Sequence, residues 1–83
     1  MVRAMYKAGE VVKVLPGSSL SSQVYLSSHP DGLVQIIGRE LDFRGRAVYK
    51  AWLREYDFWL CFYKDDIAPV SQEEAVLWRL SRA

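Results

Sequence analysis

Residues 46–70 (RAVYKAWLREYDFWLCFYKDDIAPV) constrain the fold of this chain more than any other segment. Two aromatic-rich runs are separated by a polar turn over residues 54–57, and an acidic pair then leads to Pro69. Aromatic residues in short runs bounded by turn residues favour β-strands joined by tight connections. The segment therefore predicts a mainly β fold and forms the closing part of a small β-barrel.

The length and composition of the chain set further limits. The chain of 83 residues has room for one domain, and we expect residues 1–83 to form it, with a barrel over about 6–70 and a helix over about 71–82. Hydrophobic residues make up 51% and aromatic residues 13% of the sequence, enough to stabilise a small core without a metal or a crosslink. The lone Cys61 excludes a disulfide within the chain, which favours a reducing compartment.

Charge and hydropathy restrict the partners and the location. Eleven basic and ten acidic side chains give a formal net charge of +1, whereas dedicated nucleic-acid binders usually carry a marked basic excess. The first residues lack the apolar run of a signal peptide, and no window approaches the roughly 20 apolar residues of a membrane span. We therefore expect a cytoplasmic protein with no membrane association.

Strand-like segments alternate with turn signals along the chain. The expected strands cover residues 10–15, 33–41, 46–53, 58–63 and 67–68. Gly38 marks a bulge or a bend in the second strand, and residues 42–45 predict a hairpin turn in which Gly45 takes a positive φ. The serine-rich residues 18–31 are expected to be a long loop, whose apolar residues 24–26 fold back onto the core.

The strand over residues 58–63 has two alternating sets of side chains. The purer apolar set is assigned to the interior and consists of Phe58, Leu60 and Phe62. The outward set is then Trp59, Cys61 and Tyr63. A tight helical turn is expected at residues 65–66, before the short closing strand.

The C-terminal residues change to a helical period. Ser71 and Glu74 have the spacing of a capping box, and the helix that follows places Val76, Leu77 and Leu80 on one stripe. So short a helix is marginal alone, and its apolar stripe must therefore lie on the barrel or on another molecule.

The segments GEVVKVL, GLVQII, AVYKAWL, FWLCFY and DDIAPV, in this order, resemble the SH3-like small barrels of short bacterial and phage proteins. The matching positions are Gly9, Val11, Val12, Val14, Gly32, Ile36, Tyr49, Trp59, Asp65, Asp66, Ile67, Pro69 and Val70. The resemblance implies an SH3-like antiparallel barrel of about five strands with a short C-terminal α-helix. It does not imply binding of proline-rich peptides, because the aromatic strip and the paired tryptophan of peptide-binding SH3 domains are not matched.

Catalysis requires a nucleophile beside a base, paired carboxylates or a metal cluster. His29 lies in the serine-rich segment, and Cys61 has no histidine or second cysteine near it in the sequence. We interpret His29 as a solvated loop residue, Cys61 as structural, and the acidic pair at 65–66 as a local cap of backbone N–H groups. The sequence therefore predicts no enzyme activity, no cofactor and no metal site.

Outward aromatic residues are the best candidates for binding a partner. Trp59 and Tyr63 are expected on one face, together with Tyr49 or Trp52 from the neighbouring strand. Alternatively, the C-terminal helix covers these aromatic residues, which would leave Trp78 exposed. The predicted partner-binding set is Tyr49, Trp52, Trp59, Tyr63, Trp78, Arg44, Arg46 and Arg54.

Two functions are consistent with this surface. The first is a protein-interaction module of phage or bacterial type, which binds or inhibits a host protein, or associates with itself, through the exposed aromatic residues and the C-terminal helix. The alternative is a nucleic-acid-binding barrel in which Tyr49 or Trp59 stacks on bases. Its phosphate contacts would come from Arg39, Arg44, Arg46, Lys50 and Arg54.

Overall fold

The computed structural model describes residues 6–17, 19–53 and 57–81. In chain order the elements are β1 (Val11–Val14), α1 (Leu20–Ser28), β2 (Leu33–Gln35), β3 (Gly38–Leu41), β4 (Ala47–Leu53), β5 (Phe58–Phe62), the 3₁₀ turn η1 (Lys64–Asp66), β6 (Ile67–Pro69) and α2 (Gln72–Ser81). The fold is mainly β, as predicted. In this part of the chain, no helix is long and apolar enough to cross a membrane.

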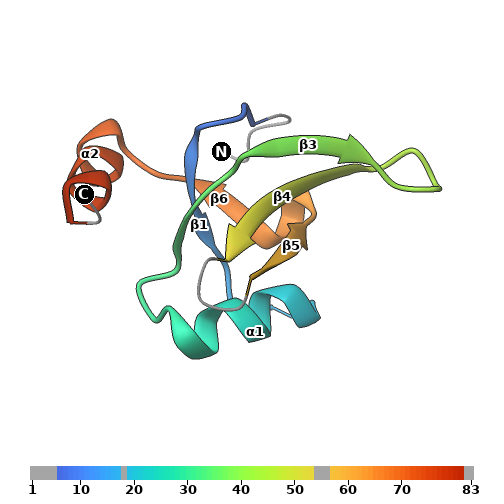
Figure 1. Cartoon of the computed structure of the whole chain (residues 1–83), viewed down its shortest axis with the longest axis horizontal. Coiled ribbons are helices and arrows are strands. Elements are labelled where there is room, and N and C mark those ends of the chain that lie inside the picture. The colour runs from blue at the N-terminus through green and yellow to red at the C-terminus, as the bar shows by residue number, and fades with distance from the viewer. Residues whose placement is uncertain (1–5, 18, 54–56, 82–83) are drawn as a thin grey trace.

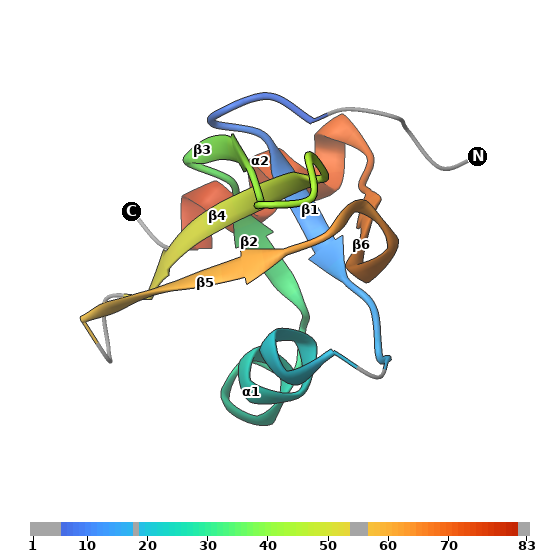
Figure 2. The same ribbon diagram turned by 90° about the vertical axis from the view of Figure 1, so that its right-hand side faces the viewer.

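The strands form two antiparallel sheets. One sheet has the order β2-β1-β6 and the other has the order β3-β4-β5. The two sheets pack across each other, with α1 at one end and α2 to the side (Figures 1 and 2). Among the described residues, no strand pairing joins the two sheets into a closed barrel.

The core lies between the sheets and under α1. Its centre is built from the inward residues of β1, β4 and β5, whose alternation places every second side chain on the same face. The fully buried large side chains include Tyr6, Tyr25, Tyr49, Phe62, Ile36 and Ile67. The rings of Tyr6 and Tyr49 meet edge to face, with their centroids 5.3 Å apart. Tyr49 is therefore a core residue, and its assignment to an outward binding face is wrong.

The serine-rich segment is a helix, which corrects the prediction of a long loop. Ser19 caps α1, because its hydroxyl accepts a hydrogen bond from the N–H of Ser22 at 3.1 Å. Tyr25 is buried against Phe62, with ring centroids 6.1 Å apart, and its hydroxyl donates to the carbonyl of Leu33. The prediction that residues 24–26 pack onto the core is confirmed, because Val24 and Leu26 also contact it.

The expected strand over residues 33–41 is divided between the two sheets. β2 ends at Gln35 and β3 begins at Gly38, so the chain passes from one sheet to the other at Ile36 and Ile37. The N–H of Ile37 donates to the carbonyl of Lys50, which is also the register partner of Gly38. Two residues thus oppose one, which is the arrangement of a β-bulge.

The next turn forms as predicted. In the hairpin between β3 and β4, Gly45 has a φ of 81° and donates its N–H to the carbonyl of Asp42. β5 departs from expectation at its first residue, because Phe58 is partly exposed rather than internal. The turn predicted over residues 54–57 falls mostly outside the described residues.

The C-terminal helix docks by a side that differs from the predicted stripe. Ala75 and Trp78 pack against Val11 and Leu33, on the outer side of the first sheet. The N–H of Glu74 donates to the hydroxyl of Ser71, which confirms the expected cap. Trp78 is therefore half-buried between α2 and the first sheet. The alternative in which α2 covers the outward tryptophans is wrong.

Candidate interaction surface

The outer face of the second sheet carries a cluster of exposed side chains. β4 contributes Lys50 and Trp52, and β5 contributes Trp59, because these residues alternate with the buried ones. Trp52 and Trp59 are direct register partners. With Ile37 from the bulge and Glu40 from β3, these residues form what we name the aromatic face: Ile37, Glu40, Lys50, Trp52 and Trp59.

The two tryptophans form the centre of this face. Their ring centroids are 5.0 Å apart and the rings are inclined at 68°, an edge-to-face contact. Trp52 is 39% exposed and Trp59 is 47% exposed, although the residues beside them on the same strands, Ala51 and Leu60, are buried. The sheet thus holds two large apolar rings in contact with water.

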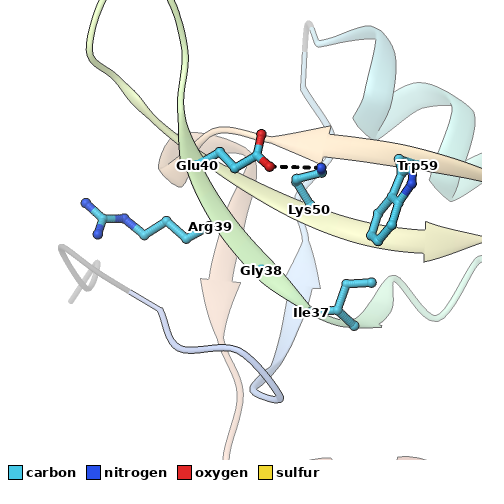
Figure 3. Close-up of a pocket in the computed structure, with 6 residues that line it drawn as sticks. All are labelled: Ile37, Gly38, Arg39, Glu40, Lys50 and Trp59. Carbon is cyan, nitrogen blue, oxygen red and sulfur yellow. Dashed lines mark hydrogen bonds and ion pairs between the residues drawn. The ribbon is translucent and has the colours of Figure 1, made fainter.

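Lys50 holds Trp59 in place from the neighbouring strand. Its ammonium lies 4.6 Å from the centroid of the Trp59 ring and 3.2 Å from a carboxylate oxygen of Glu40 (Figure 3). A cation over an indole face is attractive, and an exposed pair of this kind contributes on the order of 0.5–1 kcal/mol. The contacts of Lys50 with Glu40 and with Trp59 therefore restrict the orientation of the Trp59 indole before any partner binds.

A shallow cavity of about 230 Å³ lies beside Trp59. It is lined by Ile37, Gly38, Arg39, Glu40, Lys50 and Trp59. The side chain of Arg39 extends away from Lys50 and Trp59 (Figure 3). The cavity combines the apolar side chains of Ile37 and Trp59 with the Glu40–Lys50 ion pair.

Tyr63 belongs to a second cluster, at the end of the β3–β4 hairpin. Its hydroxyl donates to Asp42 at 3.0 Å, and the Arg46 guanidinium lies 4.1 Å from its ring centroid. Asp42 also accepts from the backbone N–H groups of Arg44 at 2.9 Å and Arg46 at 2.8 Å. A hollow of about 250 Å³ adjoins this cluster, lined by Arg46, Ala47, Tyr63, Lys64 and Asp65.

These hydrogen bonds shift two acid–base equilibria. The pKa of Asp42 is lowered from 3.8, chiefly because the Arg46 N–H favours the carboxylate. Burial opposes this effect, and the Tyr63 hydroxyl and the Arg44 N–H add to it. The pKa of Tyr63 is raised from 10.0, first because its hydroxyl donates to Asp42 and then because of burial. The cluster is thus a network that fastens the hairpin.

The structure separates the predicted partner-binding residues into groups. Trp52 and Trp59 lie together on the aromatic face, whereas Tyr63, Arg46 and Arg44 lie at the end of the β3–β4 hairpin. The Arg44 guanidinium lies over the ring of Phe43, which is almost fully exposed. Arg54 lies outside the described residues. Sequence reasoning missed Ile37, Glu40 and Phe43. The exposure of Ile37 could have been predicted from its position directly after the core residue Ile36, because successive side chains of an extended segment point to opposite faces.

The residues that could take part in catalysis or metal binding lie far from one another. Cys61 is exposed on β5, opposite Lys50 in register, and His29 ends α1 with its ring stacked on Tyr25 at 4.4 Å. His29 is thus a helix-end residue rather than part of a solvated loop. Within residues 6–17, 19–53 and 57–81, no three His, Cys, Asp or Glu side chains are placed to hold a metal ion.

Comparison with protein-family models, with curated proteins and with solved structures finds no match to this chain.

Proposed function

We propose that the protein is a small, non-enzymatic interaction module that binds a partner protein through the aromatic face. The observation that carries the proposal is the contact between the exposed rings of Trp52 and Trp59. Tryptophan is enriched among the residues that dominate the binding energy of protein interfaces. The pair is presented by two adjacent strands and needs little ordering when a partner docks.

The aromatic face has the composition of an interface centre. Trp52, Trp59 and Ile37 supply apolar area, and the Glu40–Lys50 pair supplies a polar rim next to the cavity. Because Lys50 and Glu40 already restrict Trp59, a partner meets a preorganised surface. Removing the indole rings is then expected to reduce affinity far more than removing an exposed side chain elsewhere.

The charges favour a protein partner over a nucleic acid. Lys50 is paired with Glu40, and Arg46 lies near the Asp42 carboxylate. These cations are therefore partly neutralised by the protein itself. Strong phosphate binding relies on basic side chains that release counterions from the nucleic acid. The net charge of +1 adds little long-range attraction.

The proposed architecture is that of the SH3-like small barrels of bacterial and phage proteins. It is supported by the two crossed sheets with a shared core and by the bulge at which the chain changes sheets. In this setting the chain is a cytoplasmic protein, and its partner is a host protein that it binds or inhibits. Cross-strand nuclear Overhauser contacts between the edge strands of the two sheets would support a closed barrel.

The test is an affinity capture from bacterial lysate with three matched baits. The baits are the wild type, the double variant W52A/W59A, and the control Phe43→Ala, which removes an exposed aromatic ring outside the aromatic face. Each is run with and without nuclease, at low and high salt. We expect one stoichiometric protein on the wild type and on Phe43→Ala, retained after nuclease treatment, and lost from W52A/W59A.

Two results would contradict the proposal. Equal retention of that protein by the W52A/W59A bait would remove the aromatic face from the interaction. Retention only of material that nuclease or salt releases would instead favour nucleic-acid binding.

A further inference from the structure

β3 is an edge strand with an open outer side. It forms one border of the second sheet, because the order of that sheet is β3-β4-β5 (Figure 1). Its residues Arg39, Glu40 and Leu41 are all exposed, whereas the other described edge strands, β2, β5 and β6, each contain buried residues. An edge strand in this position presents backbone groups that no neighbouring strand uses.

The hydrogen bonds to β4 show which backbone groups of β3 point inward. The N–H of Asp42 donates to the carbonyl of Arg46 at 2.9 Å, one residue pair beyond the β3–β4 ladder. Hydrogen-bonded pairs alternate with unbonded pairs along an antiparallel ladder. Glu40 and Gly38, at alternate positions before Asp42, therefore direct their backbone groups towards β4 as well.

Arg39 and Leu41 direct their N–H and C=O groups the other way, towards the open side. Among the described residues, none forms a hydrogen bond with these groups. On an extended backbone, groups at alternate residues have the spacing that another extended chain needs for a ladder of its own. The backbone of this edge is therefore complementary to a β-strand.

The neighbouring side chains define what an added strand can carry. Gly38 and Glu40 lie on the side of the sheet that bears the aromatic face, and Gly38 has open space where a Cβ would stand. A large apolar side chain beside Gly38 can therefore reach over it into the cavity next to Trp59. In the described part of the chain, Lys50 binds one oxygen of the Glu40 carboxylate and nothing binds the other, so a basic side chain fits beside Glu40 (Figure 3).

A second copy of β3 does not fit this edge. When two antiparallel copies pair about a two-fold axis, only alternate registers bring the outward N–H and C=O groups together. Those with the greatest overlap place Glu40 opposite Glu40 or Arg39 opposite Arg39, and a shift towards the hairpin places Glu40 opposite Asp42. Like charges directly opposite one another destabilise a strand pair. The occupant is therefore a segment of a different protein.

We infer that the β3 edge accepts an extended segment of the partner protein as a fourth strand of the second sheet. In this mode of binding, main-chain hydrogen bonds supply affinity and alternate side chains supply specificity. The segment carries a large apolar residue beside Gly38 and, two positions along, a lysine or arginine beside Glu40. The inference rests on the proposed function, because the apolar residue contacts the aromatic face next to Trp59.

Peptides selected from a random library displayed on phage serve as probes, with the immobilised full chain as bait and inserts of about 12 residues, long enough for a strand. We expect the enriched sequences to share an apolar residue two positions from a lysine or arginine. Leu41→Pro removes an outward N–H but no bond to β4, and it is expected to weaken peptide binding at least tenfold. Leu41→Ala, the matched control, keeps the N–H and is expected to change the dissociation constant by less than about twofold.

Amide hydrogen exchange tests the same edge without a substitution, so the test holds even if circular dichroism shows that Leu41→Pro does not fold. In the free protein, the amides of Arg39 and Leu41 are expected to exchange fast, and that of Glu40, which bonds to β4, slowly. In the complex with a selected peptide, exchange at Arg39 and Leu41 is expected to slow at least tenfold.

Three results would overturn the inference. One is a selection that enriches no peptide. Another is equal affinity of the peptides for the wild type and Leu41→Pro, or unchanged exchange at Arg39 and Leu41 in the complex. The last is slower exchange at these two amides as the concentration of the free protein rises, which would assign the edge to a second copy.

The double variant W52A/W59A separates this inference from the proposed function. Peptides that lose affinity for W52A/W59A but not for Leu41→Pro would contradict the added strand and support the aromatic face. Peptides that lose affinity for Leu41→Pro but not for W52A/W59A would support the added strand and contradict the aromatic face as the binding surface.

Discussion

Trp52 and Trp59 are direct cross-strand partners whose rings meet edge to face, 5.0 Å apart, on the exposed side of the second sheet. Three residue pairs further along the same ladder, on the opposite side of the sheet, Tyr49 and Phe62 are partners as well and are fully buried. The same two strands thus supply both the core and the surface. A substitution on one side is therefore expected to affect stability, and one on the other side to affect binding.

The first prediction separates these two roles. Phe62→Ala is expected to lower the free energy of unfolding by about 3–5 kcal/mol, because it opens a cavity in the core. Trp59→Ala is expected to lower it by only about 1–2 kcal/mol, from the loss of the ring contact with Trp52 and of the cation–π contact with Lys50. Urea unfolding followed by circular dichroism measures both. Equal losses would contradict the placement of the two rings.

The second prediction concerns two glycines. Gly32 has a φ of 74°, and an added Cβ would lie 3.2 Å from the carbonyl oxygen of Val14. Gly32→Ala is therefore expected to cost about 2 kcal/mol or more. Gly38 has open space around its Cα and no left-handed φ, so Gly38→Ala, as the matched control, should change stability by less than about 0.5 kcal/mol. Denaturant midpoints of the two variants give the comparison.

The third prediction is a pH dependence that arises at Asp42. Because its pKa is lowered from 3.8 by folding, its contribution to stability is present above pH 3.8 and is lost as the pH falls through the folded-state value. Asp42→Asn removes this titration. We expect the thermal midpoint of the wild type to fall more steeply below that pH than the midpoint of Asp42→Asn. Parallel acid limbs for the two proteins would be the contrary result.

Tyr63 contributes at the other end of the pH range. Its pKa is raised from 10.0, so its contribution is present below pH 10.0 and is lost as the pH rises through the folded-state value. Tyr63→Phe, which keeps the ring under Arg46 but removes the hydroxyl, should flatten this alkaline limb. An unchanged alkaline limb would show that the hydroxyl does not bind Asp42 in solution.

The fourth prediction tests α1, the helix that the sequence did not reveal. Ser19→Ala removes the hydroxyl that caps the helix and is expected to cost about 1 kcal/mol. Ser27→Ala changes an exposed serine of the same helix and serves as the control. Hydrogen exchange of the α1 amides should accelerate in the first variant alone, and equal exchange in both would contradict the cap.

The strand pattern was recoverable from the sequence because alternation follows directly from strand geometry. It placed Leu60 and Phe62 inside and Trp59 outside. The same alternation restricts Tyr49 and Trp52 to opposite faces, because they are three residues apart. It does not predict which of the two is buried. The register with β5 decides this, and register depends on contacts between distant segments.

α1 was missed for a local reason. Serine is a modest helix former, and residues 24–26 have the bulky apolar side chains of a strand. Burial of Tyr25 against Phe62, the contacts of Val24 and Leu26 with the core, and the Ser19 cap stabilise the helix. The docking side of α2 was missed because Ala75 and Trp78 contact Val11 and Leu33, which are distant in the sequence.

The most direct test of the aromatic face is a titration of the isotope-labelled protein with the captured partner, followed through the indole N–H signals of its three tryptophans. Single Trp→Phe variants assign the signals. We predict that the signals of Trp52 and Trp59 shift or broaden together at stoichiometric partner, while that of Trp78, which lies between α2 and the first sheet, stays in place. A shift of the Trp78 signal alone, with the other two unchanged, would contradict binding at the aromatic face.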